Sequence, residues 1–437
     1  MDDNLPTAKS LTVVTLAEEL GVISTPQARL AEARHQALRR GGIKLSLGQT
    51  LLERRFVTPL QIRGLMQEFA ARTASLAPPR NPLAANGKRM FGQYELLEIL
   101  SEKTGSRIIR ARDTLMDRPV VLKILPNSMK SDAQWAERFR RETMLLGKMA
   151  HPNLVQAYAA SEIEGHAVIA MEYVEGPSVG DRIESEGYLP EKEAWLIARE
   201  IAKALAYAAR AGILHRDIKP DNIVCSKGGR VKLIDMGLSK SLADTTHLTV
   251  EGTTVGTPFY ISPEQAGGTR SLDARTDIYS LGCSVYHMLA GVPPFWGDEI
   301  TEVMLKHVEA KRPDPREIIP EISAGSAALV MRMMAVQPEK RPPSADAVGE
   351  EIAALLPTLP KLFGQAAAAP IAIAAPRSND VLRIPAKSAS APKQFDDSSE
   401  KSARPMPQAP DSAPRERRGV KTGGAGIWRR MKSWVGM

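Results

Sequence analysis

The chain has 437 residues, a formal net charge of +8 and 43% hydrophobic residues, a composition typical of a globular protein with more than one domain. Two cysteines are too few for a disulfide framework, and neither a secretory signal nor an apolar run of about 20 residues is seen, so we expect a cytoplasmic protein. The excess positive charge falls after residue 400. The nearly neutral remainder therefore argues against nucleic acid as a partner.

The first predicted elements are helices between about residues 11 and 72. Thr25-Pro26 and Thr58-Pro59 each look like an N-cap followed by proline at the first helical position, and the two prolines are 33 residues apart. Apolar residues then recur at helical spacing: Ala28, Leu30, Ala33 and Ala37 after the first cap, and Leu60, Ile62, Leu65, Met66 and Phe69 after the second. We expect two repeated helical hairpins in a small all-α domain over residues 1–75.

The second hairpin contains the pattern Leu47-Gly48-Gln49, Leu52-Glu53 and Val57-Thr58-Pro59. It resembles the N-terminal domains of type II secretion and pilus assembly ATPases, and the resemblance implies a protein partner for this domain. A generic helical interaction module is the alternative. Residues 76–90 are rich in proline and alanine and are predicted to be a linker.

Strand and helix signals alternate over residues 91–357, and two segments there carry the chemistry of phosphoryl transfer. They are His215-Arg216-Asp217-Ile218-Lys219-Pro220-Asp221-Asn222 and Asp235-Met236-Gly237. Asp217 can accept the proton of an attacking hydroxyl, and Lys219 adds positive charge where negative charge gathers. Asn222 and Asp235 offer the hard oxygen ligands that Mg²⁺ prefers.

These segments resemble the H-R-D-x-K-x-x-N and D-F-G motifs of Hanks-type (eukaryotic-like) serine/threonine protein kinases, in their bacterial form. The resemblance implies an α+β, bilobal protein kinase fold that binds ATP, Mg²⁺ (with Mn²⁺ as the alternative) and a protein substrate. It makes Asp217 and Lys219 catalytic residues, and Asn222 and Asp235 metal ligands. Lys219 and Thr257 favour serine/threonine over tyrosine specificity.

The same resemblance assigns residues around the nucleotide. Lys123 closes the strand signal Val120-Val121-Leu122 and would meet the α- and β-phosphates. Glu142 on the next helix would pair with Lys123, and Glu137 is the alternative partner. Backbone groups of Glu172 and Val174 would bind the adenine edge.

Three further residues have structural roles by resemblance. Asp277 would brace the backbone of the catalytic loop, and Glu264 would form an ion pair with Arg341. Residues 256–264 resemble the segment that docks the substrate.

The glycine-rich loop departs from the family pattern. Its three glycine positions fall on Ser101, Lys103 and Ser106, with Ile108 at the position of the family valine. Glycine there lets the backbone close over phosphates. Serine is small enough to be tolerated, and the ammonium of Lys103 could reach a phosphate.

Residues 358–422 are rich in alanine, proline and serine and are predicted to be disordered. Residues 423–437 are predicted to form a basic amphipathic helix with Ile427, Met431, Trp434 and Val435 on one face. An anionic membrane surface suits this helix, which would place the protein peripherally at the inner membrane face. A partner groove or the kinase domain itself is the competing site.

The sequence therefore predicts a serine/threonine kinase that transfers the γ-phosphoryl group of ATP and phosphorylates its own activation loop. The alternative is a pseudokinase or signalling scaffold, because the glycine-rich loop is degenerate.

Overall fold

The computed structural model describes residues 12–360, except for 41, 42, 44, 74–88, 104, 105, 126–146, 148, 227, 236–257 and 270. Glu137, Glu142, residues 236–257 of the activation loop and the predicted helix 423–437 lie outside the described residues.

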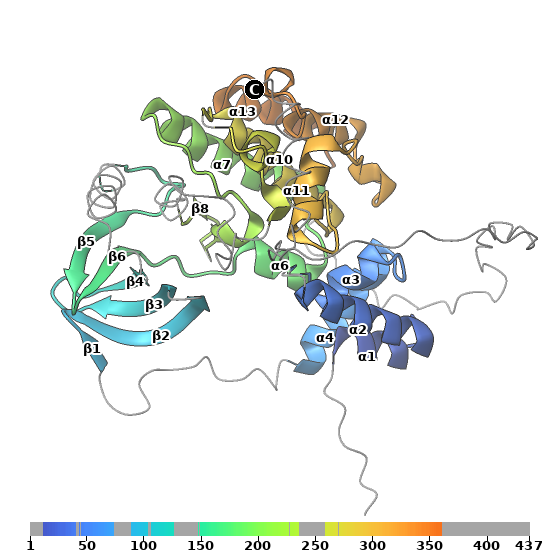
Figure 1. Cartoon of the computed structure of the whole chain (residues 1–437), viewed down its shortest axis with the longest axis horizontal. Coiled ribbons are helices and arrows are strands. Elements are labelled where there is room, and N and C mark those ends of the chain that lie inside the picture. Colours follow the sequence, from blue (N-terminus) through green and yellow to red (C-terminus); the bar gives the residue numbers. More distant parts are fainter. Residues whose placement is uncertain are drawn as a thin grey trace, which may run out of the picture. The chain divides into compact units, whose positions relative to one another are not determined.

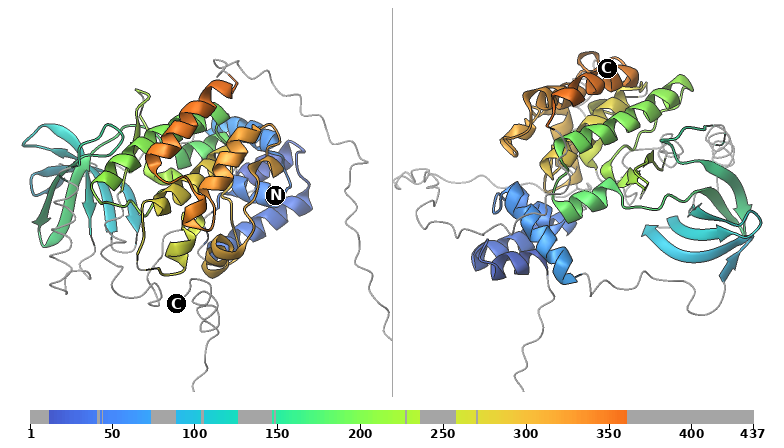
Figure 2. Two further views of the ribbon diagram at one scale, coloured as in Figure 1. Left: turned by 90° about the horizontal axis from the view of Figure 1, so that it is seen from above. Right: turned by 180° about the vertical axis from the view of Figure 1, so that it is seen from behind.

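The chain begins with four helices, drawn in blue in Figure 2. They are α1 (Val13–Glu19), α2 (Thr25–Arg40), α3 (Leu47–Glu53) and α4 (Pro59–Thr73). Their shared core is apolar and almost fully buried, and it includes Val14, Leu16, Ala31, Leu51 and Ile62. Because α1 and α3 have only seven residues each, this core and the helix caps must supply the stability that such short helices lack in isolation.

The two helical hairpins form a repeat, but its period is 34 residues and not 33. Thr58 caps α4 as predicted, since its carbonyl accepts from Ile62 N at 2.9 Å. The cap of α2, however, is Ser24 and not Thr25: Ser24 O accepts from Ala28 N at 2.9 Å. Ser24 and Thr58 are 34 residues apart, so the prolines that suggested the repeat occupy different helical positions.

The predicted apolar face of α2 is right for Ala28 and wrong for Leu30, Ala33 and Ala37. Leu30 is 46% exposed, and Ala33 and Ala37 are exposed as well, while Ala28, Ala31 and Leu38 are buried. The buried stripe thus follows a spacing of three and seven residues, and the alanine pattern led us to the neighbouring face. In α4 the prediction holds for Ile62, Leu65 and Met66 but not for Leu60, which is 57% exposed.

One lobe of the kinase fold, called the upper lobe below, is a six-stranded antiparallel sheet with strand order β1-β2-β3-β4-β6-β5, drawn at the lower left of Figure 1. Its strands are β1 (Arg89–Phe91), β2 (Tyr94–Lys103), β3 (Ser106–Asp113), β4 (Arg118–Ile124), β5 (Ala157–Ile163) and β6 (His166–Glu172). One face buries an apolar cluster that includes Leu96, Ile109, Val120, Leu122 and Val168. The register places Lys123 of β4 opposite Ile108 of β3 and Ile169 of β6.

The other lobe, called the lower lobe below, is mainly helical. Its α-helices are α6 (Val179–Glu186), α7 (Glu191–Arg210), α9 (Pro263–Ala266), α10 (Arg275–Ala290), α11 (Ile300–Glu309), α12 (Ala324–Met333) and α13 (Ala345–Leu355). Short 3-10 helices lie at Pro220–Asn222, Pro258–Tyr260, Pro315–Glu317, Pro338–Lys340 and Leu356–Thr358. Strands β7 (Ile223–Cys225) and β8 (Val231–Leu233) form a separate hairpin.

Helix α10 is the centre of this lobe, because every residue from Thr276 to Ala290 is buried. A helix that is buried on all sides must be surrounded by other elements, and α10 contacts α7, α12 and α13. The predicted α+β architecture with two lobes is confirmed. Within the described ranges, no helix has both the length and the apolar character needed to cross a bilayer.

Candidate active site

The two predicted catalytic segments are brought together by the β7–β8 hairpin. Ile223 pairs with Leu233, so the residues just before β7 and just after β8 lie side by side. The backbone confirms this contact, since Ile234 N donates to Asn222 O at 2.8 Å. Asn222 and Asp235, predicted to share a metal ion, therefore belong to adjacent backbone segments.

Asp217, Lys219 and Asn222 form one hydrogen-bonded cluster. Lys219 Nζ lies 2.8 Å from Asp217 Oδ2, and Asn222 Nδ2 donates to Asp217 O at 2.7 Å and to Oδ2 at 3.1 Å. Burial alone would lower the pKa of Lys219, but the charge and hydrogen bond of Asp217 outweigh it and raise that pKa. The ammonium therefore stays charged beside the carboxylate of Asp217.

Asp277 of α10 holds the backbone of this loop by hydrogen bonds, as predicted. Asp277 is 3% exposed, and its two carboxylate oxygens accept from His215 N and Arg216 N, both at 2.8 Å. Burial raises the pKa of Asp277, and the two backbone donors act in the opposite direction. The carboxylate is thus a two-pronged acceptor for consecutive N–H groups.

His215 is fully buried and links the two segments. Asp217 N donates to its Nδ1 at 3.3 Å, and its Nε2 lies 3.2 Å from Ile234 O. Since Nδ1 accepts, Nε2 must carry the hydrogen and donate to the carbonyl. Burial lowers the pKa of His215, which keeps the ring neutral and suited to this pair of bonds.

Two residues at the site have a left-handed backbone conformation that side chains other than glycine rarely adopt. Arg216 has φ +62° and Asp235 has φ +57°. Such conformations persist only where the surroundings hold them, and they gather at functional sites. Here the clamp of Asp277 on Arg216 N supplies part of that restraint.

Lys123 reaches the same site from the upper lobe. It lies on β4, is 6% exposed, and its ammonium forms an ion pair with the carboxylate of Asp235. The lysine and the second predicted metal ligand therefore face each other across the two lobes. Its predicted partners Glu142 and Glu137 lie outside the described residues.

The donor set suits Mg²⁺. Asn222 uses its amide nitrogen to bind Asp217, so the atom left to face a cation is Oδ1. With the carboxylate of Asp235 this gives two hard oxygen ligands, the number of protein ligands that Mg²⁺ often takes beside phosphate oxygens.

The two sides of the glycine-rich loop belong to the paired strands β2 and β3. Lys103 pairs with Ser106, and Ser101 pairs with Ile108, while residues 104 and 105 are outside the described part. Ile108 in turn pairs with Lys123, which places this strand next to the lysine predicted to bind phosphate. Only the backbone of Lys103 is described, so its proposed reach to a phosphate stays a prediction.

The segment that joins the lobes carries an ion pair that the sequence did not reveal. Glu172 Oε2 accepts from Lys232 Nζ at 2.8 Å, and the same ammonium donates to Leu154 O at 3.0 Å. Glu172 N already donates to Gln156 O at 2.8 Å, so an adenine contact from Glu172 would use its carbonyl. Val174 is half-buried beyond it.

Gly176 fixes where this connecting segment crosses the lower lobe. Its φ is +155°, and a Cβ atom there would lie 2.1 Å from Cys225 O of β7. Only glycine allows the two backbones to approach so closely. The connection between the lobes is thereby anchored just after the catalytic loop.

The predicted structural pair between Glu264 and Arg341 is present. Arg341 Nη1 and Nη2 lie 2.7 and 2.8 Å from the two oxygens of Glu264, and Thr276 Oγ1 donates to Glu264 at 2.7 Å. Burial would raise the pKa of Glu264, but Arg341 and Thr276 lower it overall. This bidentate pair ties the segment after the activation loop to the lower lobe.

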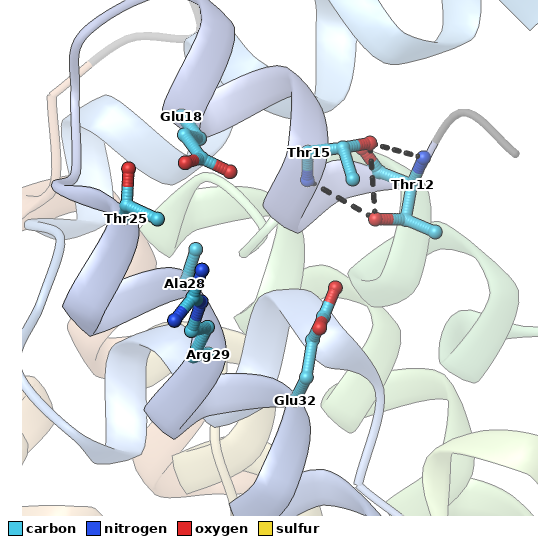
Figure 3. Close-up of a pocket in the computed structure, with 7 residues that line it drawn as sticks. All are labelled: Thr12, Thr15, Glu18, Thr25, Ala28, Arg29 and Glu32. Atoms are coloured by element: carbon cyan, nitrogen blue, oxygen red, sulfur yellow. Dashed lines mark hydrogen bonds between the residues drawn. The ribbon is translucent and has the colours of Figure 1, made fainter. Parts of the chain in front are cut away.

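A hollow of about 310 Å³ lies in the N-terminal helices, away from this site. Figure 3 shows polar and charged side chains from α1 and α2 around it. Its lining contains none of the predicted site residues and consists of Thr12, Thr15, Glu18, Thr25, Ala28, Arg29 and Glu32.

Comparison with known proteins places the chain in a family. The protein kinase domain family matches residues 94–351, which is more than half of the chain. The chain therefore belongs to the protein kinase domain family.

Its relatives include bacterial enzymes. The serine/threonine-protein kinase PknB of Mycobacterium leprae is 38% identical over 253 residues, covering 57% of this chain and 40% of the relative. PrkC of Bacillus subtilis is 34% identical over 266 residues, covering 61% and 41%. The kinase domain of Mycobacterium tuberculosis PknI has 25% identity and a TM-score of 0.51, and the match covers 62% of this chain and 99% of that domain. The matched region thus spans about two fifths of the curated relatives.

Proposed function

We propose that the chain is a serine/threonine protein kinase that uses ATP and Mg²⁺. The observation that carries this proposal is the cluster of Asp217, Lys219 and Asn222 beside the Lys123–Asp235 ion pair. Among the described residues, the charged groups that phosphoryl transfer needs lie together at this site. The matching relatives are bacterial serine/threonine kinases, which supports the same activity.

In the proposed reaction the hydroxyl oxygen of a substrate serine or threonine bonds to the γ-phosphorus, and the bond from that phosphorus to the ADP oxygen breaks. Asp217 orients the hydroxyl and takes its proton. Lys219 lies against the same carboxylate and offsets negative charge on the transferred group. Lys123 would hold the phosphates, and Asn222 and Asp235 would hold the Mg²⁺ ion, which would supply further positive charge.

A pseudokinase or scaffold is the competing function, because of the substituted glycine-rich loop. Labelled ATP with Mg²⁺ separates the two: we expect the purified chain to label itself or a general protein substrate. Asp217→Ala should abolish labelling while ATP binding, followed by calorimetry, is retained. Equal labelling by both proteins would rule out Asp217 as the catalytic base, and ATP binding without any labelling would support the scaffold.

We also propose that the kinase phosphorylates its own activation loop, with Thr249 and Thr253 as the favoured sites. Arg216 stands next to the catalytic aspartate, and a guanidinium there can pair with a phosphothreonine and order the loop. Mass spectrometry of active protein should find phosphate between residues 236 and 257. Fully active protein without it would exclude this regulation.

The terminal segments have finer proposed roles. The N-terminal helices resemble the N-terminal domains of secretion and pilus ATPases, and we propose a protein partner for them.

The basic segment 423–437 is proposed to bind an anionic membrane at its cytoplasmic face. Flotation with anionic liposomes should recover the full chain but not a chain ending at Gly419, and equal recovery would remove the tail as an anchor.

A further inference from the structure

The N-terminal helices pack against the lower lobe of the kinase domain. Leu38, Ile43 and Leu45 are at most 4% exposed and belong to the same buried apolar cluster as the core of that lobe. The Arg63 guanidinium of α4 lies 5.3 Å from the Tyr188 ring centre, in the connection between α6 and α7. Because these apolar side chains are buried against the lobe, the contact stabilises the packing of the N-terminal helices on it.

Within this interface, Gln49 of α3 presents its amide in a fixed orientation. Gln49 and Ser46 form a capping box, in which Ser46 N donates to Gln49 Oε1 at 2.8 Å and Gln49 N donates to Ser46 Oγ at 3.2 Å. Because a backbone N–H must meet an oxygen, the bond assigns Oε1 and leaves the NH₂ group on the other side. That group, Nε2, lies 2.9 Å from His287 Nε2 of α10.

His287 must therefore accept a hydrogen bond from Gln49. The ring is 6% exposed, and burial lowers its pKa to about 3, so it is neutral near pH 7. A neutral imidazole that accepts at Nε2 carries its hydrogen on Nδ1. His287 Nδ1 lies 2.6 Å from the Tyr260 hydroxyl, which consequently receives the hydrogen.

Tyr260 belongs to the segment 258–266, which touches the catalytic loop. Its carbonyl accepts from Ser280 Oγ of α10 at 2.7 Å. In the same segment, Gln265 Nε2 donates to Arg216 O at 3.3 Å, one residue before Asp217. A continuous set of polar contacts thus runs from α3 through His287 to a segment that adjoins the catalytic base.

We infer that the N-terminal helices position the segment 258–266 through the relay Gln49–His287–Tyr260, and thereby tune how the kinase holds its protein substrate. Gln49 and His287 are positioning residues that touch neither substrate nor nucleotide. The relay ends at residues 258–266 of the lower lobe and contacts none of the residues assigned to ATP. We therefore expect it to affect the binding of the protein substrate and to leave the binding of ATP unchanged. This inference rests on the proposed kinase activity for its kinetic readout.

The chain contains a matched control for Gln49. Gln61 caps α4 with Thr58 through bonds of 2.8 and 3.2 Å, the same two distances as the box of Ser46 and Gln49, and its side chain is exposed. Gln61→Ala therefore removes an equal cap from the same group of helices without touching His287. Any difference from Gln49→Ala reports on the contact with His287.

The first test compares steady-state kinetics of the full-length variants on a serine peptide. Losing one neutral hydrogen bond should raise KM for the peptide about three- to tenfold in Gln49→Ala, with KM for ATP changed less than about twofold. Gln61→Ala should match the wild type in both constants. Equal behaviour of the two variants, or an effect of Gln49→Ala on ATP alone, would overturn the inference.

The second test needs no kinase activity. In ¹⁵N-histidine NMR spectra of the full chain, with His287→Asn for assignment, the wild-type His287 should carry its proton on Nδ1. Gln49→Glu keeps an oxygen for Ser46 N and places another against His287, so Nε2 should gain a proton. An unaltered His287 signal would refute the relay, whereas the expected shift in a chain without phosphotransfer would refute only the proposed function.

Discussion

Replacing Asp277 by asparagine removes part of the support that holds the backbone of the catalytic loop. The two oxygens of Asp277 each accept a backbone N–H at 2.8 Å, from His215 and Arg216. An asparagine keeps one acceptor and turns an NH₂ group toward the other donor. One charge-assisted bond is lost and one buried N–H is left unsatisfied.

The expected loss of stability follows from those two bonds. A hydrogen bond to a charged group contributes about 1.5–3 kcal/mol, so Asp277→Asn should lower the free energy of unfolding by about 2–4 kcal/mol. The left-handed conformation of Arg216, at φ +62°, loses part of its restraint as well. We expect at least about 1.4 kcal/mol of this loss to appear in the activation barrier. Because that amount corresponds to a factor of ten in rate, kcat should fall at least about tenfold.

Urea unfolding followed by tryptophan fluorescence, and initial rates of phosphotransfer, measure the two effects. Asp273→Asn is the control, because Asp273 also accepts a backbone N–H, from Arg275 at 2.8 Å, but its side chain is 52% exposed. That variant should lose at most about 1 kcal/mol and keep its kcat. A folded Asp277→Asn protein with kcat within twofold of the wild type would refute the clamp as the support of the catalytic loop.

Three further predictions concern stability. Arg55 has φ +55° where Gly21 occupies the equivalent position of the first hairpin, so Arg55→Gly should raise the free energy of unfolding by up to about 1 kcal/mol, and a lower melting temperature would contradict this. Gly176→Ala should cost more than about 2 kcal/mol in urea unfolding, because its Cβ has no room; a neutral effect would disprove the close approach. Glu264 has a lowered pKa, so the stability from its pair with Arg341 is present above about pH 4.3 and is lost as the pH falls through the folded pKa; Glu264→Gln should flatten this acid loss, and an unchanged pH profile would argue against it.

Much of the catalytic centre could be predicted because its chemistry is concentrated in short segments. The stretch from His215 to Asn222 places Asp217, Lys219 and Asn222 within six residues, and a local loop can bring them together without help from distant elements. The ion pair of Lys123 with Asp235 depends on the fold and was not predicted, since the family resemblance gave Glu142 or Glu137 as the partner of Lys123. The sequence alone has no signal for that distance.

The contacts missed were those between segments far apart in the chain. Lys232 and Glu172 are 60 residues apart, and Gln49 and His287 are 238 apart, so no periodicity or motif joins them. The wrong face of α2 has a different cause. Alanine is tolerated on either side of a helix, and a pattern built on it does not decide which side is buried.

The central claim, that the chain transfers phosphate to serine and threonine through Asp217, is tested most directly with three peptides. They differ only in the acceptor, which is serine, threonine or tyrosine, and each is incubated with the full chain, labelled ATP and Mg²⁺. The account predicts label on the serine and threonine peptides, little on the tyrosine peptide, and none above background with Asp217→Ala. Equal labelling of all three, or labelling that survives Asp217→Ala, would contradict it.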